Sequence, residues 1–219
     1  MHTYSVDSNE RVKIIAMLAI ISYAVTPIIN KCLDWVMNLL CQIETIENFI
    51  SNIELIGYDI KQLSILVVFG ILYKLFDNKL WKTKIFQKEI VHIPDLSGEW
   101  EGKYISNWNE KTIGEVKLKI DQTWTKILIT QYNNQSKSYS RVANILVNTN
   151  KGINIIYQYE NEPNIKRTST MVAHKGFSEL FYDRENEVLD GYYTGDQRNR
   201  TASGDITYKR IQGEQKKKL

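Results

Sequence analysis

The chain has 219 residues, which suits one soluble domain with an anchor or a single large domain. Its formal net charge is +3 and its pI is about 8.6, with acidic and basic residues interleaved. A nucleic-acid-binding domain usually carries a basic stripe or a pI above about 9, so we expect no DNA or RNA partner. Two cysteines, Cys32 and Cys41, form neither a disulfide framework nor a zinc-binding spacing.

The first hydrophobic run, Ile14–Ile29, contains no charged residue. It is slightly shorter than the ~20 residues that span a bilayer. Lys13 and Lys31 flank it, and such side chains can extend to the membrane surface, so we predict a transmembrane helix at about residues 12–32. Pro27 lies near its end and can kink it.

The second hydrophobic run, Leu63–Phe76, is weaker because it contains Lys74. We predict a second transmembrane helix at about residues 58–76, which gives a helical hairpin. A buried helix of a soluble protein is the alternative for each run. The intervening segment, Cys32–Tyr58, is amphipathic, and it either prolongs the first helix or lies along the membrane surface.

Charges around the two runs predict an orientation. The intervening segment has acidic residues and no base after Lys31, whereas basic residues precede the first run and follow the second: Arg11, Lys13, Lys79, Lys82, Lys84 and Lys88. Because cytoplasmic flanks of membrane helices are enriched in Lys and Arg, both ends of the chain are expected in the cytoplasm. We therefore predict a multi-pass membrane protein with its N-terminus and its C-terminal domain cytoplasmic; the resemblance given below implies that the membrane is the bacterial inner membrane.

The C-terminal part consists of short stretches in which apolar and polar residues alternate, separated by turn residues, which is typical of β-strands. The expected organisation is a membrane region with a basic linker at residues 1–93, an all-β ligand-binding domain at 94–211 and a disordered basic tail at 212–219. Eight strands are expected, with a further arm at Thr201–Arg210 and a count uncertain by one. The other strands are Ser97–Ser106, Glu115–Gln122, Thr125–Tyr132, Tyr139–Val147, Ile153–Glu160, Ser169–His174, Ser178–Tyr182 and Leu189–Thr194. Lys175-Gly176 is among the predicted turns.

Closure of such strands removes exposed edges, so the fold class is a membrane α-helical hairpin followed by a small eight-stranded antiparallel β-barrel. A two-residue period predicts which side chains face inward. It predicts one aliphatic end and one end that gathers tyrosines and arginines. Tyrosines stack on flat rings, and arginines bind phosphate bidentately, so this end suits a ligand with planar bases and phosphates. In the alternative, the tyrosines only fill the barrel core.

No catalytic constellation is found. His92 and His174 have no obvious Cys or Ser partner, and Gly-rich phosphate loops, HExxH and GxSxG are absent from the sequence. We therefore expect a binding protein and no enzyme, with no catalytic residues, no metal ligands and no cofactor.

Two motifs behind the hydrophobic runs carry a resemblance. Pro94–Gly102 reads Pro-Asp-Leu-x-Gly-x-Trp-x-Gly, and Gly191–Gly204 reads Gly-x-Tyr-x-x-x-x-x-x-Arg-Thr-x-x-Gly. In this order the chain resembles the two-transmembrane, β-strand-rich effectors of bacterial cyclic-oligonucleotide-based anti-phage signalling (CBASS). Their barrels are lipocalin-like in shape.

The resemblance implies an effector of anti-phage defence. In it, the barrel binds a cyclic dinucleotide as its activating ligand, the protein self-associates, and its helices disrupt the inner membrane and kill the infected cell. The partners implied are the cyclic dinucleotide, the lipid bilayer and further copies of the chain, with a functional link to a cyclic-nucleotide synthase. A pore, a thinning defect and aggregation remain open as the form of membrane damage. The alternative function is a membrane-anchored lipocalin-like carrier of an apolar or lipid ligand.

The candidate ligand contacts combine the motif with the interior pattern. Arginines are expected on phosphates and tyrosines on bases, and the residues are Arg200, Arg198, Tyr193, Thr201, Tyr104 and Tyr157. Alternation places Arg200 and Thr201 on opposite faces, unless a bulge at Arg198–Ser203 resets the register.

Overall fold

A computed structural model describes residues 1–42, 63–107, 112–150, 152–164, 173–197 and 200–211. The chain forms two compact units. One is a helical unit, Asn9–Trp81. The other joins the first eight residues, Met1–Ser8, to the chain from Lys82 onward, and it contains the β-sheet.

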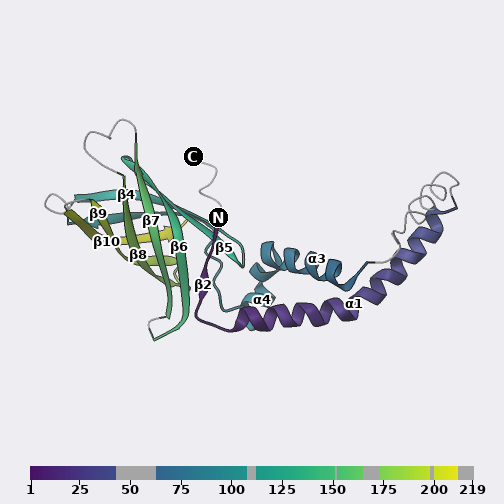
Figure 1. Ribbon diagram of the computed structural model, residues 1–219. Helices are drawn as coiled ribbons and strands as arrows, with labels where there is room; N and C mark the ends of the chain where they lie inside the picture. The colour runs from purple at the N-terminus through teal and green to yellow at the C-terminus, as the bar shows by residue number, and fades with distance from the viewer. Residues whose placement is uncertain (43–62, 108–111, 151, 165–172, 198–199, 212–219) are drawn as a thin grey trace. The chain divides into compact units, whose positions relative to one another are not determined.

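The helical unit contains one long helix, α1, which runs from Glu10 to Leu40 (Figure 1). Its 31 residues correspond to about 46 Å, more than the hydrocarbon core of a bilayer. Within the described residues it is the one helix that is long and apolar enough to cross a membrane. The helix continues through Pro27 and beyond the predicted end at residue 32. The segment from Cys32 to Leu40 therefore prolongs the first helix, which was one of the two alternatives.

Two hydroxyl side chains are buried in the apolar part of α1. The Ser22 hydroxyl donates a hydrogen bond to the Leu18 carbonyl at 2.6 Å, and the Thr26 hydroxyl donates to the Ser22 carbonyl at 2.6 Å. Both groups are satisfied inside their own helix, so the sequence tolerates them in an apolar run.

The second helix, α3 (Ile65–Asn78), packs against α1. The Asn30 amide of α1 accepts from the Leu63 N–H at 2.9 Å and donates to the Leu63 carbonyl at 3.2 Å, which fixes the start of α3. With 14 residues, α3 is about 21 Å long, short of a bilayer core. A second transmembrane helix at about 58–76 is therefore not shown, and residues 58–62 lie outside the described part of the chain.

The β-sheet closes into an eight-stranded antiparallel barrel, as predicted. It follows a 3₁₀ turn (Leu80–Lys82) and a short helix α4 (Lys84–Glu89). The strands are β3 (Gly98–Ser106), β4 (Thr112–Gln122), β5 (Lys126–Tyr132), β6 (Ser136–Thr149), β7 (Gly152–Pro163), β8 (His174–Asp183), β9 (Val188–Gln197) and β10 (Arg200–Arg210). Each strand pairs with its sequence neighbours, and β10 pairs with β3 to close the ring.

The prediction of two separate strands, Ser169–His174 and Ser178–Tyr182, with a turn at Lys175-Gly176, is wrong in its described part. Strand β8 runs without a break from His174 to Asp183, and residues 169–172 lie outside the described part of the chain. Gly176 pairs with Tyr159 on one side and Gly195 on the other. A glycine is needed there because the Tyr159 ring lies over it, so its presence does not mark a turn. The predicted arm at Thr201–Arg210 is the eighth strand.

The first eight residues, which we call the N-terminal arm, are part of the barrel. Strands β5 and β6 pair directly at only three register positions. Beyond them, β1 (His2–Thr3) pairs with β5, and β2 (Ser5–Val6) pairs in parallel with β6. Asp7 accepts from the Val147 N–H at 2.7 Å and from the Asn148 N–H at 3.1 Å. The arm therefore fills the seam that β5 and β6 leave open.

Candidate ligand-binding site

The two ends of the barrel interior differ in chemistry. At the end where β3 begins and β10 ends, which we call the base, the inward side chains are aromatic or aliphatic. Five of them are at most 2% exposed: Trp100, Leu118, Ile120, Ile155 and Leu189. The opposite end, where β3 ends and β10 begins, has polar and tyrosine side chains on the same inward faces. We call it the tyrosine end.

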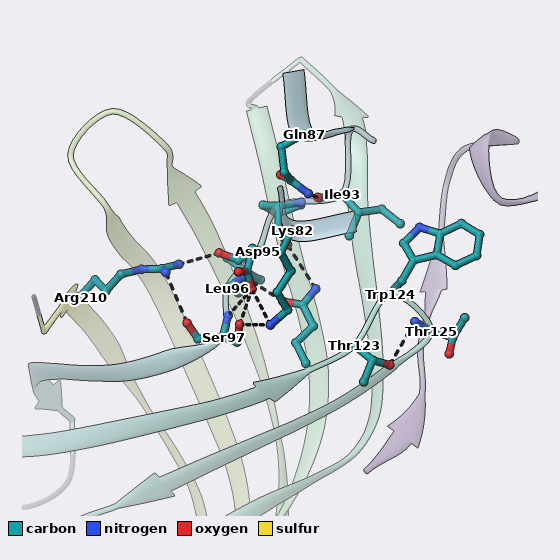
Figure 2. A network of polar contacts seen from close by, with 12 residues as sticks. Lys82, Gln87, Ile93, Asp95, Leu96, Ser97, Thr123, Trp124, Thr125 and Arg210 are labelled. Atoms are coloured by element: carbon teal, nitrogen blue, oxygen red, sulfur yellow. Dashed lines mark hydrogen bonds and ion pairs between the residues drawn. The ribbon is translucent and has the colours of Figure 1, made fainter. Parts of the chain in front are cut away.

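The segment before β3 packs onto the base with its apolar side chains. Val91, Ile93 and Leu96 are at most 1% exposed. Figure 2 shows the polar contacts of this segment, in which the Gln87 side chain donates to the Ile93 carbonyl at 3.0 Å. The Lys82 ammonium lies 3.3 Å from an Asp95 carboxylate oxygen. These contacts seal the base, so they favour entry of a ligand at the tyrosine end.

Arg210, the last residue of β10, ties the base together (Figure 2). Its guanidinium donates to the carbonyls of Asp95 at 2.6 Å and Ser97 at 3.3 Å. It also lies over the Trp100 ring, 4.6 Å from the centroid, and forms an ion pair with Glu187 at 3.3 Å. Trp100 of the Pro94–Gly102 motif therefore serves the structure of the base.

At the tyrosine end, Tyr104 and Tyr193 meet edge to face. Their ring centroids are 6.4 Å apart and the rings are inclined by 83°. Both side chains are half-buried. Burial raises the pKa of Tyr193, and a hydrogen bond with the Ser106 hydroxyl acts in the opposite direction. The sequence predicted both tyrosines as ligand contacts, and the structure brings them together.

Three further tyrosines lie deeper at this end. Burial raises the pKa of Tyr157 to about 12, and it raises the pKa of Tyr159 and Tyr208 as well. The Tyr159 hydroxyl donates to the Thr194 carbonyl at 3.1 Å, and the Tyr208 hydroxyl donates to the Gln131 side chain at 2.9 Å. All three phenols are neutral at physiological pH, and those of Tyr159 and Tyr208 donate hydrogen bonds.

Other polar side chains line the same end. Ser138 and Asn161 are buried, and the Ser138 hydroxyl donates to the Asn161 amide oxygen at 2.8 Å. His174 is paired in register with Asn161, on the inward face that also holds Gly176 and Ser178. Reasoning from the sequence did not select Tyr159, Tyr208, Ser138, Asn161 or Gln131. The two-residue alternation placed Tyr159 and Tyr208 on inward faces. A polar residue on a strand gives no such indication, because alternation alone predicts that polar residues face outward.

One of the two predicted arginines, Arg200, is the first residue of β10. Arg200 is paired in register with Gln197, and Thr201 with Asp196. The pairing of β9 and β10 is unbroken from Arg200 to Lys209, so no bulge resets the register in that stretch. Arg198 lies outside the described residues. Tyr157, also predicted, is 3% exposed and lies beside Tyr159, with ring centroids 6.3 Å apart.

Buried tyrosines make the stability of the barrel sensitive to alkaline pH. Below pH 10, Tyr157 is neutral in the folded and unfolded states. Between pH 10 and about 12 the unfolded state loses this proton while the folded state keeps it, so the free energy of unfolding falls by about 2 to 3 kcal/mol. Urea unfolding at pH 9 and pH 11.5 measures this loss. Tyr157→Phe should lose less stability over the same interval, and an equal loss in both proteins would contradict the assignment.

A closed antiparallel barrel, sealed at one end and lined with tyrosines and amides at the other, defines the class: a small barrel of the ligand-binding type. The family described as "Cap15, cyclic dinucleotide receptor domain" matches residues 91–210, which include all eight strands of the barrel. The chain belongs to this family, and the predicted resemblance to CBASS effectors is confirmed.

Two curated relatives share more of the chain. The CD-NTase-associated protein 15 of Yersinia aleksiciae is 30% identical over 141 residues, which cover 64% of this chain and 66% of the relative. The CD-NTase-associated protein 15 of Staphylococcus schleiferi is 26% identical over 165 residues, which cover 74% of this chain and 82% of the relative.

Proposed function

We propose that this protein is an effector of anti-phage defence whose barrel binds a cyclic dinucleotide at the tyrosine end. Binding promotes self-association, and the helical unit then disrupts the inner membrane and kills the infected cell. The family match over residues 91–210 is the observation that carries this proposal, because it covers the whole barrel and the family is described as a cyclic dinucleotide receptor domain.

The chemistry of the tyrosine end supports such a ligand. Cyclic dinucleotides combine planar bases with phosphates. Tyr104 and Tyr193 offer ring faces and edges for stacking, and the neutral phenols and amides around them offer hydrogen bonds. Arg198 and Arg200, at and near the start of β10, are the proposed phosphate ligands. The same polar surroundings argue against the alternative, a carrier of an apolar or lipid ligand.

The N-terminal arm supports the proposed topology. Residues on both sides of the helical unit belong to one barrel: the arm pairs with β5 and β6, and the chain from Lys82 leads into β3. Both ends of Asn9–Trp81 therefore lie on the same side of any membrane, so the unit crosses it an even number of times. The basic flanks place the barrel and the N-terminus in the cytoplasm.

The binding step is tested with the full-length protein in detergent micelles and a panel of cyclic dinucleotides that combine adenine, guanine and uracil. One of them, at about 100 times its dissociation constant, should raise the free energy of unfolding by roughly 2.7 kcal/mol, seen as a higher Tm. Arg200→Ala should lose this stabilisation and keep the Tm of the free protein. Arg141→Ala is the matched control, since Arg141 is exposed and pairs with Glu160 on the outside of β6. No Tm shift with any member of the panel would refute the binding step.

The membrane step is tested in liposomes of bacterial phospholipids loaded with dyes of different sizes. Addition of the bound cyclic dinucleotide should release dye from proteoliposomes that contain the wild-type protein. Those that contain Arg200→Ala should stay intact. Release limited to small dyes indicates a pore, and release of all sizes indicates a bilayer defect. Ligand binding without any release would contradict the proposed mode of killing.

A further inference from the structure

Four of the five tyrosines described above at the tyrosine end lie directly opposite a glycine on a neighbouring strand. The register pairs are Tyr104 with Gly114, Tyr159 with Gly176, Tyr193 with Gly204 and Tyr208 with Gly102. The fifth, Tyr157, is opposite Ser178. Side chains directly opposite in antiparallel strands are near neighbours, so every one of these rings faces a residue with little or no side chain.

At Gly114 the glycine is required by the tyrosine itself. A Cβ built on Gly114 would lie 2.5 Å from each of three Tyr104 atoms, Cε1, Cζ and the hydroxyl oxygen, and these are its three nearest atoms. The ring therefore lies over the Gly114 backbone. At Gly176 a Cβ would lie 2.2 Å from Tyr159 Cζ, so the second ring is held in the same way.

A ring that lies against the wall of a barrel covers the wall with one face and leaves its other face toward the interior. Larger residues at Gly114 and Gly176 would push the rings toward the barrel axis, where they would fill the space that a ligand needs. The glycines therefore decide whether the tyrosines act as packing or as a stacking surface.

We propose that Gly114 and Gly176 are positioning residues of the ligand site, which hold Tyr104 and Tyr159 flat so that their inward faces stack on the bases of the ligand. This inference rests on the proposed function. It assigns base recognition to the ring faces of these two tyrosines and makes purine ligands, with their larger π-surface, the better fit.

The test is isothermal titration of the full-length protein in detergent with cyclic di-AMP, cyclic di-GMP and cyclic GMP-AMP. Gly114→Ala should weaken binding of the tightest of these about tenfold, the size expected when one base loses its stacking partner. Gly191→Ala is the matched control. The three atoms nearest to its Cβ would be backbone atoms of Glu179 and Leu180 and none of a tyrosine, so it tests the effect of a strained strand without a direct clash with a ring. The folded fraction of the Gly191→Ala protein should bind the dinucleotide with the affinity of the wild type.

A double-mutant cycle separates positioning from general loss of stability. In a Tyr104→Ala background the ring is gone, and Gly114→Ala should change the dissociation constant by less than about twofold. If Gly114→Ala does not fold, Gly195→Ala replaces it, since its Cβ would lie 3.1 Å from the His174 ring and 3.3 Å from the Tyr159 hydroxyl oxygen and needs only a small shift of these two side chains. It should weaken binding about threefold.

The outcomes are distinct. If the wild-type protein binds none of these three but binds a uracil-containing dinucleotide of the wider panel, the inference fails and the proposed function stands. If it binds no member of the panel, both fail. If the wild type binds and Gly114→Ala or its replacement binds equally well, the inference fails and the proposed function stands. An additive cycle, in which Gly114→Ala weakens binding as much without Tyr104 as with it, also overturns the inference.

Discussion

Replacing Trp100 by alanine should lower the free energy of unfolding by about 4 kcal/mol. The side chain is fully buried at the base of the barrel, and its indole N–H donates to the Leu96 carbonyl at 3.1 Å. Its ring also supports the Arg210 guanidinium at 4.6 Å. Alanine would leave a large cavity and would remove one of the partners of the half-buried Arg210 guanidinium. For a small domain this is a large share of the total stability.

The effect is measured by urea unfolding of the full-length protein in detergent, followed by far-UV circular dichroism. Phe177→Ala is the control, because Phe177 is an aromatic residue of the same barrel that is 37% exposed. It should cost less than about 1 kcal/mol. A Trp100→Ala protein as stable as the control would show that the base does not depend on this residue.

The second large effect is expected at Gln122, which joins both chain segments that flank the helical unit. Its amide oxygen accepts from the Leu96 N–H at 2.8 Å, and its amide nitrogen donates to the Pro94 carbonyl at 3.2 Å and the Tyr4 hydroxyl at 3.4 Å. Gln122 is 5% exposed. Leucine has a similar size and makes none of these bonds, so Gln122→Leu should cost about 3 kcal/mol, chiefly through the unpaired Leu96 N–H and Pro94 carbonyl.

Gln158→Leu is the matched control for this variant, because Gln158 is exposed on the outside of β7. Its free energy of unfolding should change by less than about 0.5 kcal/mol. Gln122→Leu should also speed amide hydrogen exchange at Leu96 and at the paired residues of the N-terminal arm. If exchange in the arm stays at the wild-type rate, Gln122 does not hold the two segments together.

The barrel was predictable because the alternation of apolar and polar residues that marks its strands lies within each strand. Alternation in Val116–Gln122 and Ile153–Glu160 fixes the inward face without knowledge of any neighbour, and Val116, Leu118, Ile120 and Ile155 are indeed buried. Turn residues then divide the strands. The same rule failed at Lys175-Gly176, because a glycine that makes room for a ring across the sheet looks the same in sequence as a glycine in a turn.

Other features depend on contacts between distant residues. Nothing in residues 2–6 predicts that they pair with β5 and β6, more than 100 positions away, because strands of two residues carry no periodicity. The sequence did not determine where the first helix ends. The residues from Cys32 to Leu40 suit a continuation of that helix as well as a segment that lies along the membrane surface. The second transmembrane helix was predicted from apolar residues alone, and the described helix α3 is shorter than that prediction.

The sequence predicted a tyrosine-lined site at one end of the barrel, but it did not identify all of the residues that form it. Period two placed Tyr104, Tyr157 and Tyr193 on inward faces, and the structure puts all three at one end of the barrel. The depth of a residue along the barrel depends on strand tilt and on the register of both neighbours, which one strand does not encode. For that reason Tyr159 and Tyr208 were not selected, although they share the alternation.

Photo-crosslinking tests the central claim most directly. A cyclic dinucleotide that carries an 8-azido purine is bound to the full-length protein, irradiated and mapped by peptide mass spectrometry. We predict labels on Tyr104, Tyr159 or Tyr193, and we expect an excess of the unmodified dinucleotide to abolish them. Labels confined to the outer face, as on Tyr192 or Phe177, or to the base near Trp124, would contradict a ligand that enters the tyrosine end.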